Sequence, residues 1–184
     1  MEDENFDKVD FSKERFEGNY SECKFTKCNF SQTNWANVQF NHCKFLDCTL
    51  NLTQLESTRL NGVHFERCKL VGMQFYKCEE KFLSLSFKES ILECCDFADM
   101  TVKKSSFVIC KVYECLFKQV NLSESKFTNC DLKKSTFHLC DLSKCDFTDA
   151  TNYLIDPRTN NIKKSRFSMP EAVRLLDSLD IVLS

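Results

Sequence analysis

The chain has 184 residues, of which 42% are hydrophobic and 28% are charged, and its formal net charge is −2. This composition excludes an intrinsically disordered chain, and three glycines with two prolines leave no room for a flexible linker between domains. We therefore expect one folded domain.

The first residues, MEDENFDKVD, are acidic and contain no apolar run, so we expect no signal peptide. No segment of the sequence approaches the roughly 18 consecutive apolar residues that a membrane-spanning helix needs. These two features predict a cytoplasmic protein with no membrane partner.

Large apolar residues recur every five positions along almost the whole chain. An α-helix places apolar residues three or four apart and a strand places them two apart, so this spacing fits neither. The register begins at Phe6, slips once near residues 16–20 and again near residues 76–81, and then continues to Phe147. All 18 phenylalanines fall on this lattice. A short repeat of this kind must bury its side chains against its neighbours, which predicts a solenoid.

A second restricted column lies two residues before each large residue and holds mostly cysteine, serine, threonine, valine and alanine. Twelve of the 13 cysteines fall in it, and Cys94 is the exception. Cysteines twenty residues apart, such as Cys28 and Cys48, would stack with parallel side chains, which is poor geometry for a disulfide. We therefore expect free thiols in small inward positions, and no cofactor or metal. A metal or redox role for some thiols is the alternative.

The repeated unit resembles that of the pentapeptide-repeat family, A-(D/N)-L-x-x. Close copies are CNFSQ (28–32), CDLKK (130–134), CDLSK (140–144) and CDFTD (145–149). The resemblance implies an all-β fold, a right-handed quadrilateral β-helix with four units and twenty residues in each coil. It indicates the fold far more specifically than the function.

The resemblance and the spacing together place the β-helix at residues 1–167. Residues 148–167 are expected to form a distorted last coil, because Asn152 and Pro157 break the pattern there. Residues 168–184 are expected to form a capping helix and a tail.

Ser168 and Glu171 have the spacing of a capping box, in which the serine oxygen accepts an early helical N–H and the glutamate side chain reaches back. Apolar residues then follow at helical spacing, which predicts a short amphipathic α-helix over the open end of the solenoid. The arrangement is similar to the C-terminal helix of pentapeptide-repeat proteins that protect bacterial topoisomerases from quinolones.

By that resemblance we infer a homodimer that pairs end to end through the C-terminal helix. The residues expected to divide between cap and dimer interface are Leu175, Leu176, Leu179, Ile181, Val182 and Leu183. A monomer whose helix covers only its own last coil is the alternative.

The same resemblance implies a protein-binding rod that interacts with a bacterial type II topoisomerase, DNA gyrase or topoisomerase IV, and affects quinolone sensitivity. Acidic rods of this kind can act as DNA mimics. Charge weakens that interpretation here, because no acidic stripe appears when the outward residues are sorted by wall. The early wall with Lys24, Lys27, Lys44 and Arg67 is basic instead.

Two sets of outward residues are candidate partner contacts. The internal register break is either a small contact loop or a structural slip, and its charged residues are Lys77, Glu79, Glu80 and Lys81. The alternative function is a scaffold for another cytoplasmic protein, because some outward positions are apolar where the family usually has polar groups. These positions are Val108, Ile109, Tyr113 and Leu116, with Leu139 on a neighbouring coil.

Nothing in the pattern predicts an enzyme. His42, His64 and His138 fall at unrelated outward positions, and no histidine faces the same way as a neighbouring cysteine, so no nucleophile meets a base. The three glycines form no phosphate-binding loop. Direct nucleic-acid binding is not expected, because the basic wall is short and lacks interleaved exposed aromatic residues.

Overall fold

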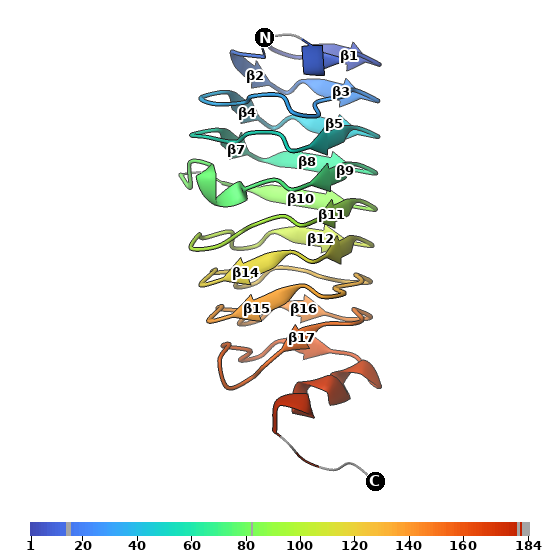
Figure 1. The fold of residues 1–184 in the computed structure, drawn as a ribbon, viewed down its shortest axis with the longest axis vertical. Helices are drawn as coiled ribbons and strands as arrows, with labels where there is room; N and C mark the ends of the chain where they lie inside the picture. Colours follow the sequence, from blue (N-terminus) through green and yellow to red (C-terminus); the bar gives the residue numbers. More distant parts are fainter. Residues whose placement is uncertain (14–15, 82, 180, 182–184) are drawn as a thin grey trace.

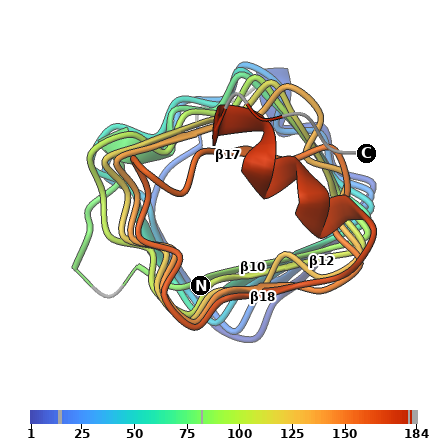
Figure 2. The same cartoon turned by 90° about the horizontal axis from the view of Figure 1, so that it is seen from below.

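The chain forms a four-sided column of parallel β-strands with one short helix over its C-terminal end (Figures 1 and 2). The computed structural model describes residues 1–13, 16–81, 83–179 and 181. Each strand pairs in parallel with the equivalent strand of the next coil. The chain therefore rises by one strand spacing, about 4.8 Å, with every coil. This architecture confirms the solenoid that the five-residue repeat predicts and the four-sided β-helix that the family resemblance implies.

Equivalent strands of successive coils form four walls, which are numbered here in chain order. The first wall contains β1 (Asn5–Asp7), β3 (Lys24–Thr26), β5 (Lys44–Leu46), β8 (Val63–Glu66), β10 (Leu85–Lys88), β12 (Ser106–Val108), β16 (Asp146–Phe147) and β18 (Arg166–Phe167). The second contains η1 (Phe11–Lys13), β6 (Thr49–Asn51), β9 (Lys69–Val71), β11 (Ile91–Glu93) and β13 (Lys111–Tyr113). The third contains η2 (Phe75–Lys77), β14 (Leu116–Lys118), β15 (Thr136–His138) and β17 (Leu154–Ile155), and the fourth contains β2 (Asn19–Ser21), β4 (Gln39–Asn41) and β7 (Arg59–Asn61). Isolated parallel bridges continue the walls where no strand is formed.

Most pairings join residues twenty apart, as between Phe25 and Phe45. Four strand pairings depart from this interval: Phe6 with Phe25 at 19 residues, Phe65 with Phe87 and Leu70 with Leu92 at 22, and Phe137 with Ile155 at 18. They lie at the N-terminal slip, across the internal break and in the last coil. Despite each change of interval, the inward residues of neighbouring strands remain paired with each other.

The first wall directs an unbroken stack of phenylalanine rings inward along the length of the column, and only the rings at its two ends are partly exposed. Neighbouring rings are nearly parallel, with centroids 4.6–5.2 Å apart. The stack consists of Phe6, Phe25, Phe45, Phe65, Phe87, Phe107, Phe127, Phe147 and Phe167. Aromatic contact adds to the free energy of apolar burial, so this stack is a principal source of stability.

The small inward positions favour cysteine, serine and threonine because these side chains bond the preceding coil. Cys48 Sγ donates to the Phe25 carbonyl oxygen over 3.4 Å, and Ser135 Oγ donates to the Val112 carbonyl oxygen over 2.7 Å. In both cases the acceptor is the large residue 23 positions earlier. A buried hydroxyl without a partner would cost about 1–3 kcal/mol, so these hydrogen bonds make a polar group acceptable inside the column.

The cysteines occupy the small inward positions as expected. All 13 thiols are free, twelve are buried, and Cys94 is exposed at a corner. Burial raises the pKa of Cys43 to about 11 and that of Cys145 to about 12. At neutral pH these groups are therefore thiols, which are poor nucleophiles.

We predict that the native protein reacts rapidly with a thiol reagent such as DTNB at Cys94 alone. The other twelve thiols should react only after denaturation, because the reagent needs an accessible thiolate. The colour released before and after adding guanidinium chloride measures the two groups. The Cys94→Ser variant should lose the rapid reaction, and several rapidly reacting thiols in the native wild-type protein would contradict this assignment.

Corner residues between the walls have left-handed backbone. Among the described residues, 26 residues other than glycine have φ between +50° and +64°. Leu52, Ile109 and Leu139 are the large apolar residues among them, and each side chain is more than half exposed. Left-handed backbone is especially unfavourable for the β-branched Ile109. Exposure together with backbone strain makes these three positions candidate contacts.

The C-terminal helix η3 (Glu171–Leu179) lies across the last coil (Figure 2). The predicted capping box is wrong, because Ser168 Oγ accepts a hydrogen bond from the Asp149 N–H (3.1 Å) and Glu171 Oε1 accepts one from the Asn152 N–H (2.7 Å). Both side chains thus satisfy donors of the solenoid. The helix is also of the 3-10 type rather than α. Without a side-chain cap, tighter bonds such as Val173 N–H to the Pro170 carbonyl satisfy its first turn.

Candidate protein-binding surfaces

The loop between η2 and β10 leaves the regular column and projects beyond its outline, as Figure 2 shows for the green segment. Lys77 Nζ lies 3.6 Å from Glu56 Oε2, and Glu79 forms an ion pair with Arg59. The Glu79 N–H also donates to the Thr58 carbonyl oxygen over 2.9 Å. The preceding coil therefore fixes one side of the loop. Its other charged residues from the sequence analysis, Glu80 and Lys81, are exposed.

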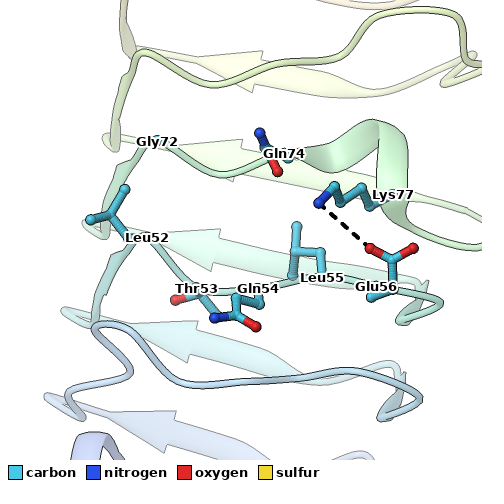
Figure 3. Close-up of a pocket in the computed structure, with 8 residues that line it drawn as sticks. All are labelled: Leu52, Thr53, Gln54, Leu55, Glu56, Gly72, Gln74 and Lys77. Atoms are coloured by element: carbon cyan, nitrogen blue, oxygen red, sulfur yellow. Dashed lines mark ion pairs between the residues drawn. The ribbon is translucent and has the colours of Figure 1, made fainter.

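A hollow of about 260 Å³ lies beside this loop, on the third wall and the corner before it (Figure 3). Its lining residues are Leu52, Thr53, Gln54, Leu55, Glu56, Gly72, Gln74 and Lys77. Gly72 has φ of +66°, and a Cβ there would lie 2.7 Å from Leu52 Cδ2. Glycine therefore allows the Leu52 side chain to lie across the corner. The hollow presents an apolar side chain next to two exposed amides, those of Gln54 and Gln74, which suits contact with a protein.

The structure does not bring the four apolar candidates of the Ile109 coil together. Val108 ends β12 on the first wall, Ile109 occupies the following corner, Tyr113 ends β13 on the second wall, and Leu116 begins β14 on the third. Tyr113 Oη donates a hydrogen bond to Asp131 Oδ2 over 2.8 Å, and this bond, with burial and the negative charge, raises the pKa of Tyr113. These residues therefore face different sides of the rod.

An apolar groove between the third wall and η3 was not predicted from the sequence. It has a volume of about 510 Å³, and its lining includes the buried Phe137 and Ile155 and the exposed Leu154. Both Leu116 and Leu154 pair with Thr136, from opposite sides. The sequence pattern missed Leu154 because the interval shortens to 18 residues there, so periodicity no longer shows which way a side chain points.

The end of the column also exposes apolar side chains around η3. These are Met169, Leu176, Leu179 and Ile181. Leu175 is partly buried against the core and belongs to the cap. Val182 and Leu183, which were also expected at the interface, lie outside the described residues. The described members of the predicted interface thus divide into one cap residue and three exposed residues.

The walls contain no assembled catalytic or metal-binding group within the described residues. No set of three or more histidine, cysteine, aspartate or glutamate side chains there could hold a metal ion. His42, His64 and His138 are exposed, whereas twelve thiols face the interior, so these thiols meet no histidine. Burial, followed by the charges of Lys44 and His42, lowers the pKa of His64. In the same part of the chain, no helix has the length and apolar character to cross a membrane.

Comparison with solved structures places the fold among known β-solenoids. Full-length QnrB1, a plasmid-mediated fluoroquinolone resistance protein, matches with a TM-score of 0.60 at 15% identity over 98% of this chain and 99% of that chain. A trypsin-treated QnrB1 variant matches with a TM-score of 0.52 at 17% identity over 100% and 99% of the two chains. HetL, a pentapeptide repeat protein of the cyanobacterium Nostoc, gives 0.43 at 11% identity over 90% and 85%. Identities this low establish the fold alone.

Sequence comparisons identify the repeat directly. A search of curated proteins gave no significant match. Two family models do match, "Pentapeptide repeat region" at residues 18–81 and "Pentapeptide repeats (8 copies)" at residues 113–151, and together they cover more than half of the chain. With the four-walled solenoid and its similarity to QnrB1, these matches show that the chain belongs to the pentapeptide-repeat family.

Proposed function

We propose that the protein is a non-catalytic, protein-binding rod that pairs with a second copy and acts on a bacterial type II topoisomerase. The observation that carries the binding role is the exposure of apolar side chains, at strained corners and at the C-terminal end, on an otherwise regular scaffold. Exposed apolar surface of this kind marks interaction sites. The fold-level similarity to QnrB1, a fluoroquinolone resistance protein, supports DNA gyrase or topoisomerase IV as the partner to test first.

The C-terminal end is the surface that would pair two copies. Leu176, Leu179 and Ile181 remain exposed there. A two-fold interface uses the same patch on both subunits, so one apolar end can bury itself against its copy. Pairing at this end would leave the loop at residues 77–81 accessible to another protein on each subunit.

A contact through the loop at residues 77–81 is more consistent with the charge distribution of the chain than imitation of DNA is. The whole chain carries only −2, and Lys24 and Lys44 lie exposed on the first wall. Arg67 is neutralised by Asp47 and Glu66, at 2.8 Å and 2.6 Å, so the basic character of the early wall is weaker than its sequence suggests. Even with this neutralisation, the walls do not have the dense negative charge of a DNA backbone.

The test is a gyrase supercoiling and DNA-cleavage assay with and without a fluoroquinolone. We expect the purified protein to restore supercoiling by drug-treated gyrase and to reduce drug-stabilised cleavage. The Glu80→Ala/Lys81→Ala variant should require about tenfold more protein for the same rescue, because a localised contact dominates binding energy. Asp3→Ala/Lys8→Ala is the matched control, since it also removes one exposed acid and one exposed base.

Absence of any effect on gyrase and topoisomerase IV would overturn the proposed partner. The second candidate function, a scaffold for another protein, would then be the one to test, and exposed leucines on the third wall favour it. Leu116, Leu139 and Leu154 are exposed near the apolar groove on the third wall, where they offer a docking face separate from the loop.

A further inference from the structure

A strip of basic side chains follows the corner between the fourth and first walls over the last coils. Its members, all exposed, are Lys103, Lys104, Lys126, Lys144, Lys163, Lys164 and Arg166. We call this surface the basic strip. The coils hold it in register, because the Lys104 N–H donates to the Ser123 carbonyl and the Lys144 N–H donates to the Lys163 carbonyl.

The basic strip has a concave side on the first wall. A groove of about 370 Å³ is lined by Glu124, Ser125, Lys126, Lys144, Asp146, Lys164 and Arg166. Lys126 and Arg166 belong to one ladder, in which each pairs with Asp146 from opposite sides. Coils spaced by about 4.8 Å carry the corner residues Lys104, Lys144 and Lys164 over a length of about 15 Å.

The carboxylates within the basic strip already interact with groups of the protein itself. Glu124 lies between two lysines, with its carboxylate 3.9 Å from Lys104 Nζ and 3.5 Å from Lys144 Nζ. Asp146 Oδ1 accepts hydrogen bonds from the Thr148 N–H (3.0 Å) and Oγ1 (2.6 Å). Although burial opposes ionisation, these bonds and the charges of Arg166 and Lys126 lower the pKa of Asp146. Asp146 is therefore ionised at neutral pH.

Positive charge nevertheless exceeds negative charge along the basic strip. Within the ranges that the structure describes, Lys126, Lys164 and Arg166 form no ion pair. Asp141 also borders the strip, but its Oδ1 accepts from the Ser143 N–H and from Asn161 Nδ2. Several cations thus remain available to a ligand from solution.

We propose that the basic strip binds an acidic segment of a partner protein, an extended stretch rich in aspartate and glutamate. Flexible lysine stems can follow carboxylates that vary in spacing, and the groove admits side chains between Lys126 and Lys164. Complementary charge of this kind steers association and sets specificity.

Three observations favour an acidic protein segment over nucleic acid. The sequence pI is about 6.0, far below that of typical nucleic-acid-binding domains. Glu124 and Asp146 lie among the lysines, where they would repel closely spaced phosphates. Among the described residues, the exposed large aromatic side chain is Tyr76, which lies outside the basic strip, so the strip offers no platform for stacking bases.

The test measures binding of a fluorescein-labelled peptide of alternating aspartate and serine, about twelve residues long, by fluorescence anisotropy. We expect saturable binding that weakens when salt is raised from about 50 to about 200 mM. The Lys144→Glu/Lys164→Glu variant should bind about tenfold more weakly or worse, since it reverses two central charges. Both side chains are exposed, so the variant should keep the thermal unfolding midpoint of the parent.

Lys24→Glu/Lys44→Glu makes the same charge change on the first wall, several coils away, and should leave the Kd within about twofold. Equal weakening by the two variants would overturn the proposal, because binding would then follow net charge alone. Absence of saturable binding in low salt would also overturn it. So would tighter binding of a DNA duplex of about 20 base pairs than of the peptide, which would assign the strip to nucleic acid. This test involves neither a topoisomerase nor dimerisation, so its outcome is independent of the function proposed above.

Discussion

Replacing Phe107 by alanine should lower the free energy of unfolding by about 3–5 kcal/mol. The ring is 1% exposed and is stacked between Phe87 and Phe127, with centroids at 4.9 Å and 4.6 Å. It also meets Phe97 and Phe117 edge to face, at 6.2 Å and 6.4 Å. The substitution therefore removes apolar burial and aromatic contacts, and it leaves a cavity that rigid neighbouring coils cannot close.

Urea unfolding followed by circular dichroism measures this loss. Phe107→Leu should cost less, because leucine occupies equivalent positions of the second and fourth walls and fills most of the space. Lys111→Ala, on an exposed position of the next wall, should change the free energy of unfolding by less than about 0.5 kcal/mol. Coincident unfolding curves for Phe107→Ala and the parent would contradict the stacked core described here.

The second large effect is expected at the C-terminal end, where Leu176→Asp combined with Leu179→Asp should convert the proposed dimer to a monomer. Both side chains are exposed in the single chain, at 37% and 45%, so the substitution leaves the column intact. In a dimer they would be buried, and an unpaired buried carboxylate is strongly unfavourable. Sedimentation velocity at micromolar concentration should show the variant as a 21.5 kDa species and the parent at twice that mass.

Leu52→Asp combined with Ile109→Asp is the matched control. These side chains are 55% and 52% exposed, but they lie at corners on the sides of the column and not on the end that η3 covers, so this variant should remain dimeric. A parent protein that sediments at 21.5 kDa under the same conditions would reject the dimer and leave η3 as a cap for its own coil.

The five-residue spacing predicts that the chain winds into a solenoid, and the family resemblance supplies the four walls. One large and one small inward residue in every five, with almost no glycine or proline, can be buried only by stacking coils. The same columns predicted that twelve cysteines would be buried and that Cys94 would not. Local spacing is sufficient here because each unit contacts chiefly the equivalent units one coil away.

Predictions from residue spacing were wrong or incomplete where a residue's role depends on the packing of other coils. Ser168 and Glu171 have the pattern of a helix cap, but they accept hydrogen bonds from the N–H groups of Asp149 and Asn152 in the solenoid instead. Leu154 could not be assigned to a face, because the coil interval changes in the segment that contains it. The donors that bind Ser168 and Glu171 lie about one coil away along the chain, and a local motif does not represent contacts of that range.

The binding surfaces depend even more on how residues from different coils are arranged in space. Val108, Ile109, Tyr113 and Leu116 are near one another along the chain, yet a four-sided coil turns them toward different walls. Conversely, Lys104, Lys144 and Lys164 are far apart along the chain and adjoin one corner, where they form the basic strip. Inward residues of a solenoid are constrained by a repeated local environment, so their pattern by itself predicted that the chain forms a solenoid. Outward residues form a surface only when successive coils stack in register, and that stacking is what assembled the groove, the strip and the exposed end.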